Sequence, residues 1–128
     1  MKKPFGFPKS EKLCSKKDIK GLFENGDSVF LYPYKIYYLK KDIPHYKVLI
    51  LSPKKRIKKS VDRKKVLRRI REAFRLQKKI FFEEISLEYG HLGIVYVGTV
   101  ENEFTSLFTK LKQAIERLKH KVKEKIDI

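Results

Sequence analysis

The chain has 128 residues and a formal net charge of +17, with 41% hydrophobic residues, which fits one domain with a core and argues against wholesale disorder. Cys14 is the only cysteine, which excludes an intrachain disulfide or cysteine-based zinc site and favours a reducing, cytoplasmic location. No apolar run approaches the ~20 residues of a membrane span, and we expect neither a secretory signal nor a membrane partner.

The first predicted element is a helix at about residues 16–24. Ser15 and Asp18 fit a capping box that would begin it, and Asn25 followed by Gly26 fits a stop. Between these signals, three apolar residues share one helical face: Ile19, Leu22 and Phe23.

Three predicted strands follow, at residues 29–32, 36–40 and 47–51, with a turn candidate at Pro33 and an end signal at Pro53. Because side chains alternate along a strand, Ile36 and Tyr38 should point to one face of the sheet, with Tyr37 and Leu39 on the other. Both faces are apolar. One should pack on helices, and the other is either also covered or a ligand surface.

A helix is predicted at about 61–77, because four apolar residues recur at helical spacing: Val66, Ile70, Ala73 and Phe74. Ser60 or Asp62 can cap it. Residues 78–88 are a candidate second helix, 93–98 a strand, and 103–122 a last amphipathic helix. The order in the single domain is α-β-β-β-α-(α)-β-α, in which the strands before and after the 61–77 helix can share one sheet and form a βαβ-like unit.

The charge is concentrated around the 61–77 helix. Residues 54–79 hold 14 Lys and Arg but only two acids, Asp62 and Glu72. Such a density predicts a cationic surface with a polyanion as partner, whose binding falls steeply with salt. Residues 53–59 form a basic loop before the helix, and we expect the loop and the helix to form one joint surface. The alternative is a generic basic patch.

At 100° per residue, four basic side chains of the helix fall within a sector of roughly 60°, away from its apolar face. They are Lys64, Arg68, Arg71 and Arg75. Guanidinium groups suit bidentate phosphate contact and stacking on bases. The alternative is a solvated face with ion pairs, but beyond the capping candidate Asp62 the helix contains one acid, Glu72. Arg63 and Arg69 flank the apolar side instead, where either could form a salt bridge at the core edge.

Three short runs resemble the signature of the bacterial ribonuclease P protein subunit: Ser52-Pro-Lys-Lys55, Ser60-Val-Asp-Arg63 and Arg68-Arg-Ile-Arg-Glu-Ala-Phe-Arg75. The order of the predicted helices and strands also resembles that of the family over nearly the whole chain. Three positions depart from it. Lys64 replaces the Asn of an Arg-Asn-Arg triplet, Leu67 replaces a Lys, and Ile19 stands where many members have an aromatic residue. Lysine cannot reproduce an amide, so a family role in organising metal ions does not carry over to Lys64.

The resemblance implies a single-domain α-β sandwich of the α+β class, with a four-stranded mixed sheet and a left-handed βαβ crossover. It also implies assembly with a catalytic RNA that cleaves precursor transfer RNA at its 5′ end. It implies that the RNA and its magnesium ions perform the hydrolysis, that the protein alone binds no cofactor, and that it is inactive alone. It further implies that the basic helix and loop bind RNA, through Lys54, Lys55, Arg56, Arg63, Lys64, Lys65, Arg68, Arg71 and Arg75.

The resemblance also implies a cleft between the first helix and the sheet that holds the single-stranded 5′ leader. The residues themselves are compatible with such a cleft, because aromatic rings can stack on unpaired bases and lysines can contact phosphates. The candidates are Lys16, Ile19, Lys20, Phe23, Tyr34, Tyr37 and Tyr38, with Lys35 nearby. The alternative is that Phe23 and one of Tyr37 and Tyr38 are core residues.

No pattern of a protein catalytic site stands out. His45, His91 and His120 lack metal-ligand spacing and are expected at the surface or in loops. Cys14 has no evident partner for nucleophilic catalysis. A protein-only nuclease is therefore disfavoured, and a non-catalytic ribosomal or structural RNA-binding protein is the main alternative function.

Overall fold

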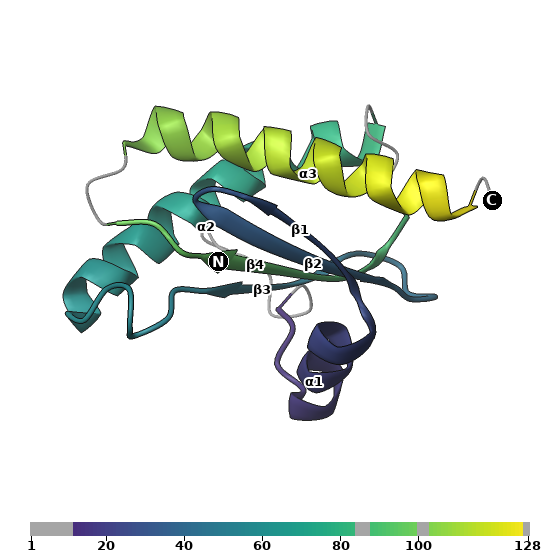
Figure 1. Ribbon diagram of the computed structural model, residues 1–128, viewed down its shortest axis with the longest axis horizontal. Coiled ribbons are helices and arrows are strands. Elements are labelled where there is room, and N and C mark those ends of the chain that lie inside the picture. The colour runs from purple at the N-terminus through teal and green to yellow at the C-terminus, as the bar shows by residue number, and fades with distance from the viewer. Residues whose placement is uncertain (1–11, 84–87, 100–102, 127–128) are drawn as a thin grey trace, which may run out of the picture.

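The computed structural model of the chain describes residues 12–83, 88–99 and 103–126, and within these ranges it contains three helices and four strands (Figure 1). In chain order they are α1 (Lys16–Asn25), β1 (Asp27–Leu31), β2 (Tyr34–Lys40), β3 (Lys47–Leu51), α2 (Ser60–Glu83), β4 (Gly90–Tyr96) and α3 (Phe104–Ile126). In these ranges, no helix combines the length and apolar character needed to span a membrane.

The four strands form one mixed sheet in the order β1-β2-β4-β3. Strand β2 pairs antiparallel with both β1 and β4, whereas β3 and β4 are parallel. Parallel neighbours need a crossover, and α2 supplies it between β3 and β4. Helices α2 and α3 lie on one face of the sheet and α1 lies on the other (Figure 1). The predicted α+β sandwich with a mixed four-stranded sheet is confirmed.

The predicted second helix at 78–88 is wrong. Helix α2 continues without a break to Glu83, and Glu88 lies outside any helix, just before β4. Neither Gly nor Pro occurs between Lys54 and Tyr89, so the sequence contains no strong signal that would end the helix at residue 77. Residues 84–87, which the prediction also included, lie outside the described residues.

The main core fills the space between the sheet and the pair α2 and α3. It is one cluster of buried residues that includes Ile36 of β2, Ile94 of β4, Phe74 of α2 and Leu111 of α3. The buried Gln77 joins the two helices, because its Nε2 donates to the Phe108 carbonyl oxygen at 2.7 Å. This hydrogen bond helps to hold α2 against α3, with the basic side of α2 facing outward.

Both edge strands have polar groups from neighbouring segments on their outer side. At β1, Arg117 Nη1 donates to the Phe30 carbonyl oxygen at 2.8 Å, and Lys121 Nζ donates to that of Ser28 at 2.5 Å. At β3, the backbone N–H of Leu13 donates to the Val48 carbonyl oxygen at 3.0 Å. Such covering limits pairing of an edge strand with another chain.

Helix α1 begins and ends as its sequence predicts. The Ser15 side chain accepts a hydrogen bond from the backbone N–H of Asp18, which is one half of the predicted capping box, and the helix ends at Asn25. Gly26 has an extended backbone rather than a left-handed one. Its lack of a side chain matters because a Cβ there would lie 2.5 Å from the Leu22 carbonyl oxygen.

Candidate RNA-binding surfaces

Helix α2 has one buried and one exposed side. Val66, Ile70 and Phe74 are buried in the core. Basic residues are exposed along the other side: Lys64, Lys65, Arg68 and Arg71. The predicted two-sided helix is therefore confirmed. From Lys64 to Arg71 the exposed cations extend over about 10 Å, enough to meet more than one phosphate of a nucleic acid strand.

Arg75, the last member of the predicted basic sector, is engaged within the protein. Its Nε donates to Glu72 Oε2 at 3.2 Å and its Nη2 donates to Glu72 Oε1 at 2.6 Å. The hydrogen bonds to Glu72 raise the pKa of Arg75, and the negative charge of Glu72 adds to the effect. The bidentate geometry that suits a phosphate is thus occupied by a carboxylate.

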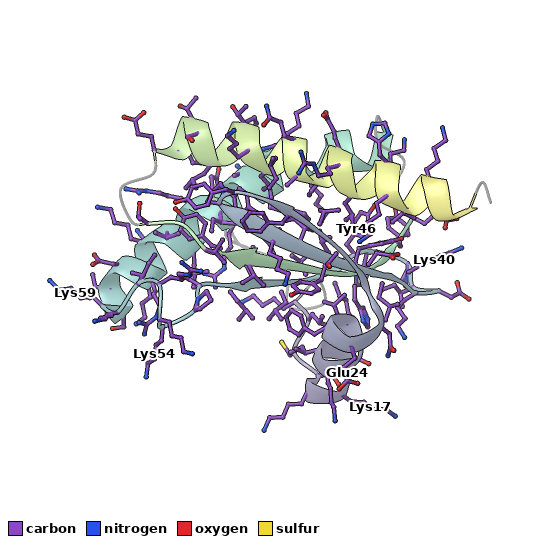
Figure 2. All side chains as sticks on the ribbon, in the orientation of Figure 1. Lys17, Glu24, Lys40, Tyr46, Lys54 and Lys59 are labelled. Atoms are coloured by element: carbon purple, nitrogen blue, oxygen red, sulfur yellow. The ribbon has the colours of Figure 1, made fainter. Side chains whose placement is uncertain are left out.

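Residues 53–59, called the basic loop below, carry five exposed cations: Lys54, Lys55, Arg56, Lys58 and Lys59. The Pro53 carbonyl oxygen accepts hydrogen bonds from the backbone N–H groups of Arg56, at 3.0 Å, and Ile57, at 3.4 Å. The Ile57 side chain is 5% exposed and belongs to the core. Lys54 and Lys59 point outward from this loop (Figure 2).

Arg63, predicted to bind RNA, lies in the first turn of α2 and turns back toward the basic loop. Its Nη1 donates to the carbonyl oxygens of Ile57 and Lys58, at 2.8 Å each. These contacts are not the salt bridge at the core edge that was the alternative for Arg63, because both acceptors are backbone carbonyl oxygens.

On the opposite face of the sheet, α1 packs against β2 and β4. The rings of Phe23 and Tyr37 meet edge to face, with centroids 4.6 Å apart, and Lys35 Nζ lies 5.3 Å from the Tyr37 ring centroid. Gly93 pairs with Tyr37 in the sheet, and a Cβ on it would lie 3.1 Å from Leu22 Cδ2. The glycine therefore allows α1 to approach the sheet closely beside this aromatic pair.

Tyr34 and Tyr38 were predicted to lie in the leader cleft, and this prediction is wrong. Tyr34 is 0% exposed and its hydroxyl donates to the Leu107 carbonyl oxygen at 2.9 Å. Tyr38 is 2% exposed and its hydroxyl donates to the Glu88 carbonyl oxygen at 2.7 Å. Burial raises the pKa of both hydroxyls, that of Tyr38 to about 12. Strand alternation is the reason, because both side chains point to the face covered by α2 and α3.

The remaining predicted leader residues lie on α1. Lys16 and Lys20 are exposed, and Ile19 is half-buried. Lys20 Nζ lies 3.9 Å from Glu24 Oε1, one turn later on the exposed helix surface. An exposed pair of this kind contributes little to stability, so Lys20 can exchange it for a phosphate.

Phe30 is a further exposed aromatic residue that the sequence alone does not single out, with 54% of its surface exposed. Phe30 pairs with Lys35 across β1 and β2, so its side chain shares the sheet face of Tyr37. The register of the hairpin would have revealed this, but the predicted strand 29–32 did not specify one.

The expectation that His91 lies at the surface or in a loop is also wrong. It lies within β4 and is 5% exposed. Its Nδ1 is buried and has no hydrogen-bond partner among the described residues. Burial lowers the pKa of His91, an effect that the nearby Asp18 opposes and that Lys41 and Lys47 reinforce.

One family of known proteins matches most of this chain. The sequence model of the family described as Ribonuclease P matches residues 7–119. This match covers the basic loop, all of α2 and most of the remaining chain. The chain belongs to the ribonuclease P protein family.

Relatives within the ribonuclease P family are distant in sequence. The chain is 25% identical over 119 residues to the ribonuclease P protein component of Porphyromonas gingivalis, covering 89% of this chain and 87% of the relative. It is 40% identical over 65 residues to the component of Streptococcus thermophilus, covering 51% of this chain and 58% of the relative.

Solved structures of ribonuclease P proteins share the fold. The protein from Staphylococcus aureus superposes with a TM-score of 0.73 at 19% identity, over 86% of this chain and 96% of that one. The protein from Thermotoga maritima superposes with a TM-score of 0.70 at 20% identity, over 84% and 96%. At these sequence identities the likeness establishes the fold alone.

Proposed function

We propose that this chain is the protein subunit of ribonuclease P and binds the catalytic RNA of that enzyme. The observation that carries the proposal is the exposed side of α2, where Arg68 and Arg71 face outward within residues 54–79, a segment that contains only two acids. One of those acids, Glu72, is bound to Arg75. A helix that buries its apolar side and presents guanidinium groups on the other suits a phosphate backbone.

We further propose that the α1 side of the sheet binds the single-stranded 5′ leader of precursor transfer RNA. The edge-to-face pair of Phe23 and Tyr37, with Lys35 beside it, supports this assignment. Half-exposed aromatic rings can stack on unpaired bases without sequence preference, and neighbouring lysines can contact the phosphates. Phe30, exposed on the same face, extends the apolar surface toward β1.

In this proposal the RNA subunit and its magnesium ions perform the hydrolysis, and the chain contributes binding and orientation of the substrate. Within the described residues, no group of three or more His, Cys, Asp or Glu side chains is arranged to hold a metal ion. The contribution of the chain to the rate is to hold the precursor in register with the RNA active site.

Reconstitution tests the proposal directly. Cleavage of precursor transfer RNA by the cognate catalytic RNA should be faster with the chain than without it at low magnesium concentration, and the chain alone should not cleave. Capture of cellular RNA with the chain should enrich the catalytic RNA. Enrichment of ribosomal RNA as the sole partner, with no effect on cleavage, would instead favour a structural RNA-binding protein.

A further inference from the structure

The basic loop has a conformation that its charges alone would oppose. Five of its seven residues are exposed cations, and the loop contains no acid. Like charges at this density repel one another and favour expanded conformations. The loop nevertheless has a defined turn, so other interactions must hold it.

Two of these interactions are local. The Pro53 carbonyl oxygen accepts the backbone N–H groups of Arg56 and Ile57, which closes a tight turn. The Ile57 side chain is buried in the core and anchors the middle of the loop. Neither interaction fixes the segment after Ile57, which leads into α2.

Arg63 fixes that segment. Its Nη1 donates to the carbonyl oxygens of Ile57 and Lys58, and its backbone N–H donates to the carbonyl oxygen of Lys59 at 3.1 Å. Three consecutive carbonyl groups are thereby directed toward one residue. Their side chains include those of Lys58 and Lys59, which are exposed.

We propose that Arg63 is a positioning residue that orders the basic loop for RNA binding, and that it acts through loop carbonyls rather than through a phosphate. This inference rests on the proposed function, in which the loop and α2 bind the catalytic RNA. A loop that is already ordered loses less conformational entropy on binding, which increases affinity without any additional contact.

The chemistry of the side chain supports this role. One Nη1 nitrogen carries two hydrogens, and the two loop carbonyls accept both. A lysine at position 63 would keep the positive charge, but its side chain is shorter and its ammonium lacks the planar geometry that directs the two Nη1 hydrogens toward the two carbonyl oxygens. Charge and positioning can therefore be separated by substitution.

The test compares wild type with Arg63→Ala, Arg63→Lys and Arg56→Ala, the last being a matched control in which an exposed arginine of the same loop is removed. Binding of the catalytic RNA is measured at several salt concentrations. Amide hydrogen exchange is measured on the free protein at Arg56 and Ile57, whose hydrogen bonds to Pro53 do not involve the Arg63 side chain, and at core amides of β2 and β4.

A positioning role predicts that Arg63→Ala and Arg63→Lys both lower affinity about tenfold with the wild-type salt slope, and both speed exchange at the two loop amides but not in the core. Arg56→Ala should reduce the salt slope by about one unit and leave loop exchange unchanged.

Arg63 would be a direct phosphate contact, and the inference overturned, if Arg63→Lys bound like wild type while Arg63→Ala lost about one unit of salt slope. Faster exchange throughout the core in both variants would also overturn it, because Arg63 would then support the whole fold. A wild-type chain that did not bind the catalytic RNA would overturn the proposed function itself, and the exchange data on free protein keep the two failures apart.

Discussion

Adjacent tyrosines of β2 have different environments because strand side chains alternate. Tyr37 meets Phe23 on the α1 side of the sheet, whereas Tyr38 is buried on the other side with its hydroxyl bonded to the Glu88 carbonyl oxygen. The alternation of Ile36 and Tyr38 against Tyr37 and Leu39 is predictable from sequence. Which of the two faces α1 covers cannot be predicted from the sequence, because both sets of side chains contain apolar and aromatic residues.

The same substitution at these two neighbours should therefore have different effects. Tyr38→Phe removes a partly buried hydrogen bond and should lower the free energy of unfolding by about 1 kcal/mol. Tyr37→Phe keeps the ring that meets Phe23 and should change it by less than about 0.5 kcal/mol. Urea denaturation measures both. Equal losses would mean that the Tyr37 hydroxyl has a structural role of its own.

His91 should make stability depend on pH. Its folded-state pKa is lowered by burial from the ordinary value of 6.5, so below that pH the unfolded chain binds a proton that the folded chain resists. The free energy of unfolding should thus fall as pH decreases through about 6.5 and below. His91→Gln should flatten this part of the profile, and His120→Gln, at an exposed position of α3, is the control. The idea fails if both variants keep the wild-type slope.

Helix α2 has an apolar side that can be predicted from its sequence and an ion pair, between Glu72 and Arg75, that cannot. Val66, Ile70 and Phe74 predict the buried side from their spacing alone. Glu72, in contrast, has arginines four residues before it, three before it and three after it, each at a spacing that permits an ion pair. Only the rotamers within the fold select Arg75 as its bidentate partner.

Releasing Arg75 from this pair should strengthen RNA binding. In Glu72→Gln the carboxylate is lost, so the ion pair that holds the guanidinium at Glu72 is removed and a nearby negative charge no longer repels the RNA. We expect tighter binding of the catalytic RNA and a salt slope steeper by about one unit. Glu116→Gln, which removes an exposed acid of α3, changes net charge equally and is the control. An equal gain in both variants would show that net charge alone is responsible.

The sheet separates the two proposed RNA-binding surfaces, which are the α1 side of the sheet and the exposed side of α2 with the basic loop. Helix α1 lies on one side of it and α2 with α3 on the other, and the basic loop extends from the end of β3 (Figure 1). The element order is close to what the sequence predicts, apart from the second helix. The position of β4 between β2 and β3 was not predicted, because pairing between strands distant in sequence depends on the packing of α2 across the sheet.

Two separate surfaces imply two kinds of defect in precursor cleavage. We expect loss of Arg68 and Arg71 to weaken assembly with the catalytic RNA, a defect that mass action can overcome. We expect loss of Phe23 to weaken the proposed hold on the leader in the assembled enzyme, which extra protein cannot restore. With protein in large excess, Arg68→Ala/Arg71→Ala should therefore cleave precursor at the wild-type rate, while Phe23→Ala should keep a reduced kcat/KM, lower by about tenfold.

The control is mature transfer RNA, which has no leader and should bind equally to assembled enzymes containing wild type or Phe23→Ala. Thermal melting of the free Phe23→Ala protein tests whether the fold survives, a check that is needed because the ring is half-buried against Tyr37. Recovery of both variants at high protein concentration would place Phe23 in assembly rather than in leader binding. Equal weakening toward mature and precursor transfer RNA would exclude a leader-specific role, because the only difference between the two ligands is the segment that the α1 side of the sheet is proposed to hold.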